Sequence, residues 1–273
     1  MSASAGSGPA VLITGASSGI GQAAARHLAG RGFRVFGTSR SPRSPSPDEH
    51  GVEWVALDVG DEASAREAVA TVLRRAGRLD AVVCNAGFGI FGSVEEVSIE
   101  DAQRQLDTNF FGVLRTLRAA LPVMRAAGRG RVVLVGSLAG RAPIPFQAHY
   151  SASKAAVDNL ALALRNEVAP FGITVSLVEP GDINTPFNDA MDWGDPGRSA
   201  YGEQIAACER VIRESLPRAP GPEVVARAIE KALSARRPRV RYAVGAESTL
   251  VPLGKRLLPD WLNLRLIRSH FGL

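Results

Sequence analysis

The turn that decides the fold is Thr14-Gly15-Ala16-Ser17-Ser18-Gly19-Ile20-Gly21, between a short apolar run at residues 10–14 and an alanine-rich helical pattern at residues 20–29. Glycines at a strand-to-helix turn let the backbone approach a pyrophosphate closely, and the helix N-terminus offers free N–H groups with a partial positive charge. The spacing is G-x-x-x-G-x-G, not G-x-G-x-x-G. We interpret this turn as a phosphate-binding loop.

Short apolar strands and alanine-rich helices alternate along the rest of the chain. Strands are expected at residues 10–14, 34–38, 52–57, 81–84, 132–136, 174–178 and 239–243, and helices at residues 20–29, 63–75, 99–127, 150–169 and 223–235. The strands are mostly β-branched, as is typical of strands that are buried on both faces. The alternation predicts one Rossmann-like α/β domain over residues 10–273, a doubly wound, mostly parallel sheet flanked by helices on both faces.

Composition excludes several classes of function. The formal net charge is only +5, and no basic cluster is interleaved with aromatic residues, so we expect no nucleic-acid partner. The two cysteines, Cys84 and Cys208, have no metal-ligand spacing, so we expect no metal. Residues 1–9 lack the apolar core of a signal peptide, and no apolar stretch approaches the ~18 residues of a spanning helix. We expect a disordered tail over residues 1–9 and a cytoplasmic protein.

The same turn also matches the G-x-S-x-G nucleophile elbow of hydrolases, with Ser17 as the nucleophile. That elbow needs an acid and a histidine downstream. His149 and His270 exist, but nothing in the sequence marks either as a partner. Almost no chain precedes the first strand, so the usual upstream oxyanion motif is missing. We therefore favour phosphate binding.

Tyr150 and Lys154 are four residues apart at the start of a helical pattern, so their side chains share one face. An unperturbed tyrosine has a pKa of about 10, which is too high for an efficient base near neutrality. A neighbouring ammonium group favours the phenolate and lowers that pKa. The sequence thus predicts a proton donor and acceptor. The alternative is a tyrosine packed beside a surface lysine.

Several short motifs occur in a fixed order: TGASSGIG at residues 14–21, Asn85-Ala86-Gly87, Ser137, Tyr150-Ser151-Ala152-Ser153-Lys154, and Pro180-Gly181. Each motif alone is weak, but the ordered set resembles the short-chain dehydrogenase/reductase family from the first strand to the last. The resemblance implies a catalytic set of Asn109, Ser137, Tyr150 and Lys154. In that set Ser137 holds the carbonyl oxygen, and Asn109 links Lys154 through water to solvent. A serine that caps a loop and a buried, satisfied asparagine are the alternatives.

The end of the second strand predicts which nicotinamide cofactor is used. An acidic residue there binds the ribose of NAD and repels a 2′-phosphate. This chain has Ser39 and Arg40 instead, which can hydrogen-bond and neutralise that phosphate. The alternative is a solvated loop arginine. With the motifs of the resemblance, the expected NADP(H)-binding residues are Gly15, Ser17, Ser18, Gly19, Ile20, Gly21, Ser39, Arg40, Asp58, Val59, Asn85, Ala86, Gly87, Tyr150, Lys154, Pro180, Gly181, Ile183 and Thr185.

The substrate pocket is expected to be mostly apolar, with an irregular lid over residues 182–220 that follows a strand's carboxyl end. The expected lining is Ser137, Phe91, Leu138, Ile144, Phe146, Phe187, Met191 and Trp193. Such a lining suits a medium or large hydrophobic ketone or the corresponding alcohol. The same residues are equally compatible with an ordinary core.

The tail over residues 246–273 mixes leucines, Trp261 and Phe271 with lysine and arginine. A basic amphipathic stretch of this kind suits a membrane surface. Packing on its own domain or on a partner subunit is the more frequent outcome, and we favour it. The family resemblance also implies a homodimer or homotetramer that is paired through the helices at residues 99–127 and 150–169.

These observations together predict an NADPH-dependent carbonyl reductase, or alcohol dehydrogenase, that transfers hydride between the nicotinamide and a hydrophobic ketone or secondary alcohol. The alternative in another class is an NADP(H)-binding sensor or scaffold without catalysis. The complete set of Asn109, Ser137, Tyr150 and Lys154 argues against a sensor, since binding alone does not need a proton relay.

Overall fold

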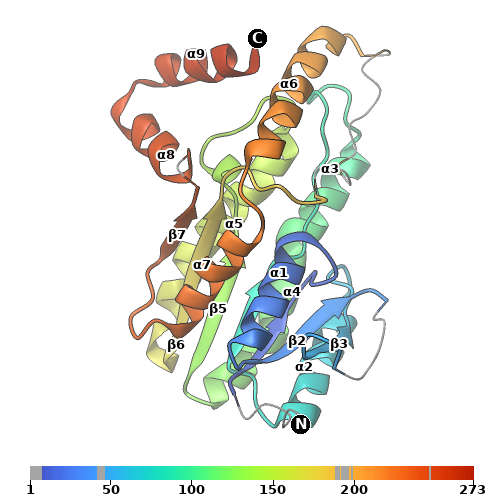
Figure 1. Cartoon of the computed structure of the whole chain (residues 1–273), viewed down its shortest axis with the longest axis vertical. Helices are drawn as coiled ribbons and strands as arrows, with labels where there is room; N and C mark the ends of the chain where they lie inside the picture. The colour runs from blue at the N-terminus through green and yellow to red at the C-terminus, as the bar shows by residue number, and fades with distance from the viewer. Residues whose placement is uncertain (1–7, 42–46, 188–190, 192–196, 198, 246) are drawn as a thin grey trace.

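A computed structural model describes residues 8–41, 47–187, 191, 197, 199–245 and 247–273 (Figure 1). Within them, seven parallel strands form one sheet in the order β3-β2-β1-β4-β5-β6-β7. The strands are β1 Ala10–Ile13, β2 Arg34–Ser39, β3 Val52–Ala56, β4 Ala81–Cys84, β5 Gly130–Val135, β6 Ile173–Pro180 and β7 Arg241–Val244. The predicted single-domain, doubly wound fold is confirmed. The predicted tail over residues 1–9 stays a prediction, because residues 1–7 lie outside the described part.

The strand order reverses between β1 and β4, which lie side by side although two strands separate them in sequence. Ligands of open α/β sheets bind at this switch point, outside the carboxyl ends of the strands. Thr14 follows β1 and Asn85 follows β4, so both motif segments meet at this edge.

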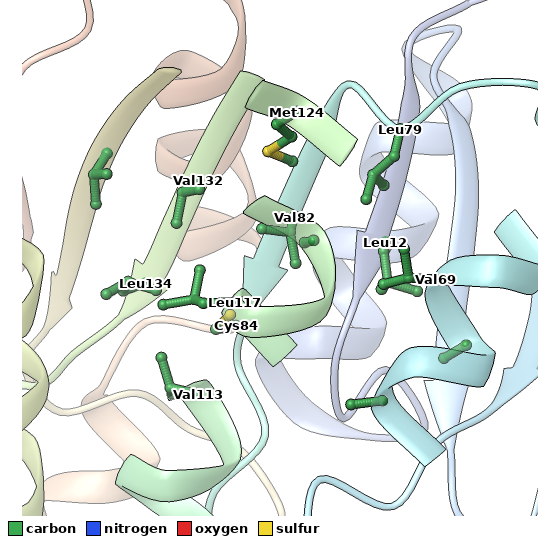
Figure 2. Close-up of a cluster of buried hydrophobic side chains, with 14 of the residues drawn as sticks. Leu12, Val69, Leu79, Val82, Cys84, Val113, Leu117, Met124, Val132 and Leu134 are labelled. Carbon is green, nitrogen blue, oxygen red and sulfur yellow. The ribbon is translucent and has the colours of Figure 1, made fainter. Parts of the chain in front are cut away.

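Helices cover both faces of the sheet. Because successive side chains of a strand point to opposite faces, each strand packs against helices on both sides. Leu12 points to the face covered by α2, α4 and α5, where it packs near Val69 and Val82 (Figure 2). Val11 and Ile13 point to the face covered by α1 and α7. The helix bounds are α1 Gly19–Gly30, α2 Glu62–Ala76, α3 Ile99–Leu106, α4 Gly112–Ala126, α5 Ala148–Val168 and α7 Glu223–Ser234.

The long helix expected over residues 99–127 has a π-helical turn, Asp107–Phe111, between α3 and α4. A π turn holds one extra residue per turn and therefore redirects the side chains within it, and such turns are frequent at functional sites. Asn109 is the buried residue of this turn.

The segment expected to be irregular, residues 182–220, contains helix α6, Gly202–Ser215, and a following 3-10 turn, Leu216–Arg218. The tail forms two further helices, α8 Glu247–Leu257 and α9 Asp260–Phe271. Figure 1 shows them beyond β7, outside the layers that sandwich the sheet. None of the helices in the described part of the chain has the length and apolarity needed to cross a bilayer.

Candidate active site

The turn after β1 leaves the N-terminus of α1 open to an anion. Ser18 is the N-cap residue, but its side chain caps no N–H group, and the first turn of α1 holds no acidic residue. Gly15 has φ of 65° and Gly19 has φ of 53°, values that glycine adopts without strain. A helix start with uncapped N–H groups and no negative charge suits a phosphate group.

Asn85 and Thr14 hold this turn against β4. The Asn85 Nδ2 donates to the carbonyl oxygens of Thr14 at 3.0 Å and Gly15 at 3.1 Å, while the Thr14 Oγ1 accepts from the N–H groups of Asn85 and Ala86. A Cβ atom at Gly21 would lie 2.2 Å from the Gly15 oxygen and 2.5 Å from the Asn85 Nδ2. Asn85 therefore holds the turn in place through these hydrogen bonds, and a side chain at residue 21 would collide with the turn.

One cavity of about 640 Å³ extends from this turn across the carboxyl ends of the strands. It is lined by all but one of the residues expected to bind the cofactor. Those lining it are Gly15, Ser17, Ser18, Gly19, Ile20, Ser39, Arg40, Asp58, Val59, Asn85, Ala86, Gly87, Tyr150, Lys154, Pro180, Gly181, Ile183 and Thr185. Gly21 is the exception, because it is buried behind the turn.

Ser137 and Tyr150 meet at the wall of the same cavity. Ser137 follows β5 and begins a 3-10 turn, in which its Oγ accepts from the Ala139 N–H at 3.1 Å. Tyr150 lies in the first turn of α5 and lines the cavity beside Ser137, whose side chain acts to lower the pKa of the tyrosine. The two hydroxyl groups can therefore contact the same substrate oxygen.

Lys154 is one helical turn after Tyr150 and is buried, with its Nζ donating to the Val135 carbonyl oxygen at 2.9 Å. The Nζ lies 5.8 Å from the centre of the Tyr150 ring. The lysine is thus held between β5 and the tyrosine, and the alternative of a surface lysine is wrong.

The pKa of the tyrosine is shifted opposite to the expectation from sequence. Burial raises the pKa of Tyr150 to about 12, although the neighbouring Ser137 side chain acts to lower it. Burial also lowers the pKa of Lys154 to about 8. The cost of removing the charged form of each side chain from water exceeds the stabilisation by its neighbours, so each pKa is shifted in the direction that favours the neutral form. The expectation that Lys154 lowers the pKa of Tyr150 is not met.

Asn109 does not line the cavity but sits behind it. Its Oδ1 accepts from the Phe88 N–H at 3.0 Å, and its Nδ2 donates to the Phe88 carbonyl oxygen and to the Ser153 Oγ, both at 3.0 Å. A Cβ atom at Gly87 would lie 3.0 Å from the Asn109 Oδ1 and 3.8 Å from the Lys154 Nζ. Asn109 therefore ties the segment after β4 to α5, close to Lys154. Its place in a water relay stays a prediction.

The expected substrate residues divide into two layers. Ser137, Ile144, Phe187 and Met191 line the cavity, and the Phe187 ring centre lies 5.6 Å from that of Tyr150. The other described members, Phe91, Phe146 and Leu138, are not among the lining residues, and Phe91 and Phe146 lie in an apolar cluster with Met191. Trp193 lies outside the described residues.

Sequence reasoning missed part of the lining. The residues not expected at the cavity are Leu57, Arg104, Thr108, Val135, Gly136 and Gln147. Phe88 and, from the expected lid, Asp182, Pro186, Ile212 and Leu216 line it as well, although they were not singled out individually. The apolar spacing of Ile205, Cys208 and Ile212 could have identified α6, and hence Ile212 and Leu216. No sequence signal marks Arg104, in α3, or Thr108, in the π turn that follows it.

A sequence model of the family described as short chain dehydrogenase matches residues 9–194. The chain belongs to this family. It is therefore an oxidoreductase whose relatives act on CH–OH and C=O groups. Membership replaces the hydrolase hypothesis, because the family's glycine-rich turn occupies the position of the nucleophile elbow.

Two curated relatives match over most of this short-chain dehydrogenase. It is 38% identical over 266 residues to a 3-ketodihydrosphingosine reductase of Bacteroides thetaiotaomicron, covering 96% of this chain and 98% of the relative. It is 35% identical over 258 residues to the human 17-beta-hydroxysteroid dehydrogenase type 1, covering 85% of this chain and 76% of the relative.

Solved structures agree with the fold. A short-chain dehydrogenase from Streptomyces avermitilis superposes with a TM-score of 0.79 at 33% identity, over 97% of this chain and 96% of that one. A short chain dehydrogenase from Burkholderia cenocepacia in complex with NADP has a TM-score of 0.77 at 25% identity, over 95% of this chain and 97% of that one.

Proposed function

We propose that this short-chain dehydrogenase is an NADPH-dependent reductase of a hydrophobic ketone. The observation that carries the proposal is that Ser137 and Tyr150, with Lys154 one helical turn away, line the wall of the cavity that also contains the phosphate-binding turn. A sensor that only binds a nucleotide does not need this arrangement.

The side chains suit reduction in particular. A bound nicotinamide coenzyme supplies the hydride equivalent. Ser137 then donates a hydrogen bond to the substrate oxygen as negative charge develops on it. Tyr150, whose pKa is raised to about 12, stays protonated at neutral pH and can give its proton to that oxygen. Lys154 would hold the ribose hydroxyls beside the tyrosine. The raised pKa of Tyr150 therefore favours the acid role over the base role.

The NADP preference rests on the end of β2. Ser39 and Arg40 line the cavity there, and neither is acidic. Arginine pairs with phosphate through two parallel hydrogen bonds, whereas a carboxylate at this position repels it. Among the structural neighbours, one is described in complex with NADP and another with NADH, so the neighbours leave the choice open.

Replacing Arg40 with alanine is expected to weaken NADPH binding by roughly 10- to 100-fold, which corresponds to a lost charge-assisted hydrogen bond of about 1.5–3 kcal/mol. The Kd of NADH is expected to change less than twofold, because NADH lacks the 2′-phosphate. Fluorescence titration of both nucleotides measures the two affinities. Arg118→Ala removes an exposed guanidinium from α4 and is the matched control. Equal losses for NADPH and NADH at Arg40→Ala would contradict the assignment.

The substrate proposed is a long-chain ketone that carries an amino group beside the carbonyl. The relative from Bacteroides thetaiotaomicron, which matches nearly end to end, is named for such a substrate. The apolar wall of Phe187 and Met191 is backed by Ile205 and Phe271 and suits an alkyl chain. Asp182 brings a carboxylate to the same cavity, where its Oδ2 accepts from the Ser215 Oγ at 2.8 Å. A substrate ammonium group would pair with it.

This substrate class is tested by NADPH oxidation with matched long-chain 3-ketones, with and without a 2-amino group. Asp182→Asn is expected to lower kcat/KM about two- to fivefold for the amino ketone, as for loss of an exposed charge pair of about 0.4–1 kcal/mol, and to leave the plain ketone unchanged. Asp158→Asn, on α5 in an ion pair with Arg241, is the control for a lost carboxylate. Equal turnover of both ketones by the wild type and Asp182→Asn would overturn the amino-ketone proposal and leave the reductase itself standing.

A further inference from the structure

Helix α8 presents a stripe of exposed leucines. Leu250, Leu253 and Leu257 are 64%, 53% and 72% exposed. They are spaced three and four residues apart, so they share one face of the helix, whereas Ser248 and Pro252 are buried on the opposite face. Helix α8 is therefore packed against the protein on one side and leaves an apolar side uncovered.

Helix α9 continues this apolar surface. Trp261 and Leu264 are 65% and 57% exposed, whereas Leu266, which is 52% exposed, lies on the other side of the helix, five positions from Trp261. Arg265 and Arg268 share a face with Trp261 and Leu264, because Leu264, Arg265 and Arg268 are three, four and seven positions after Trp261. We call Leu250, Leu253, Leu257, Trp261 and Leu264 the tail face. In Figure 1 both helices lie outside the layers of the sheet domain.

The charges of the two tail helices are mostly positive. Helices α8 and α9 contain the cations Lys255, Arg256, Arg265 and Arg268, and two acids, Glu247 and Asp260, each in the first turn of its helix. A second copy of the chain would bring the same cations together across a two-fold axis, which is unfavourable. Anionic lipid headgroups complement them instead, at about 1 kcal/mol per cation near the surface. Exposed tryptophan with leucine is also typical of residues that enter the headgroup region.

The inner side of the tail connects this surface to the cavity. Phe271 and Ile267 of α9 pack in one apolar cluster with Ile205 of α6 and with Met191. Met191 also lines the cavity. A lipid-facing tail would therefore lie against the apolar wall of the site.

We propose that the tail face docks on the surface of an anionic lipid bilayer, with α8 and α9 lying in the plane of the interface. The proposal rests on the exposed residues of the tail and not on the proposed function, although a long-chain ketone would reach the cavity from such a surface. At 11 and 12 residues, the two helices are too short to span a bilayer and suit an interfacial position.

Co-sedimentation of the full chain with vesicles tests this proposal. Vesicles of phosphatidylcholine with 30% phosphatidylglycerol are compared with pure phosphatidylcholine, at low salt and at 0.5 M NaCl. The wild type is expected to bind the anionic vesicles and to lose most of that binding at high salt, where charges are screened within a few ångströms. Leu250→Ser/Leu253→Ser/Leu257→Ser should lower the partition coefficient more than tenfold, and Arg265→Gln/Arg268→Gln roughly fivefold per arginine.

The matched control is Val94→Ser/Ile99→Ser/Phe171→Ser, which removes exposed apolar side chains from other surfaces and should bind vesicles like the wild type. Circular dichroism checks that each variant is folded. If the leucine variant is unfolded, the proposal is tested by the Arg265→Gln/Arg268→Gln variant and by the salt dependence of wild-type binding. No binding of the wild type to anionic vesicles overturns the proposal. Equal loss in the control triple overturns it as well. Dissociation of an oligomer by the leucine variant, without vesicle binding by the wild type, would assign the face to a second copy.

Discussion

Replacing Tyr150 with phenylalanine is expected to lower kcat for ketone reduction by roughly 10²- to 10⁴-fold, the contribution of a positioned general acid. The substitution removes one hydroxyl from the cavity wall and leaves the ring packed near Phe187. The Kd of NADPH should stay within about twofold, because the phosphate-binding turn and Arg40 are untouched. Steady-state turnover and a nucleotide titration measure the two effects separately.

Tyr201→Phe is the control for the loss of a phenol, since the Tyr201 hydroxyl donates to Glu95 Oε2 at 2.7 Å and does not line the cavity. It should keep nearly full turnover. Ser137→Ala should behave like Tyr150→Phe, but with a smaller loss, because the tyrosine still provides the proton. If Tyr150→Phe retained more than a tenth of wild-type turnover, another group would have to be the acid.

Replacing Lys154 with methionine is expected to abolish most turnover and yet to stabilise the fold at pH 7. Burial lowers the pKa of Lys154 from 10.5 to about 8, so below pH 8 the folded chain bears the full cost of a buried ammonium. That cost is about 3 kcal/mol at 1.36 kcal/mol per pKa unit. Losing the hydrogen bond to the Val135 oxygen offsets about 1 kcal/mol, so we expect a net gain of about 2 kcal/mol.

Because the pKa of Lys154 is lower in the folded chain than in the unfolded chain, the stability gained by Lys154→Met depends on pH. Between pH 8 and 10.5 the unfolded chain binds more protons at this lysine than the folded chain, so the lysine's contribution to the free energy of unfolding rises with pH. The advantage of Lys154→Met should therefore be full at pH 7 and shrink toward pH 10. Urea unfolding at pH 7, 8, 9 and 10 measures it as a difference from the wild type. Lys255→Met, at an exposed lysine of α8, should show no such trend. A destabilised Lys154→Met at pH 7 would contradict the account.

Much of the site could be predicted from sequence because its motifs are local. The glycine turn at residues 14–21 depends on backbone freedom within eight residues, and the shared face of Tyr150 and Lys154 depends on one helical turn. The alternation of apolar strands with helices predicts the parallel sheet. The reversal of the strand order between β1 and β4 then brings Thr14 and Asn85 together.

The remaining features depend on contacts between distant segments. The side chain of Asn109 in the π turn is hydrogen-bonded to Phe88, 21 residues away, and to Ser153, 44 residues away. No local pattern encodes such distant partners. The direction of the Tyr150 pKa shift depends on burial, which only the assembled cavity determines. Helix α6 is a different case, because its apolar spacing was present in the sequence but was outweighed by the surrounding turn residues.

The central claim is that the protein moves a hydride from NADPH to a ketone carbon while Tyr150 protonates the oxygen. Its most direct test is a single-turnover reaction of a long-chain ketone with NADPH that carries deuterium at the transferable position of the nicotinamide, followed by mass spectrometry of the product. The account predicts a secondary alcohol with one deuterium on the carbinol carbon, formed at least 100-fold more slowly by Tyr150→Phe. An alcohol without deuterium, or equal rates in both proteins, would contradict it.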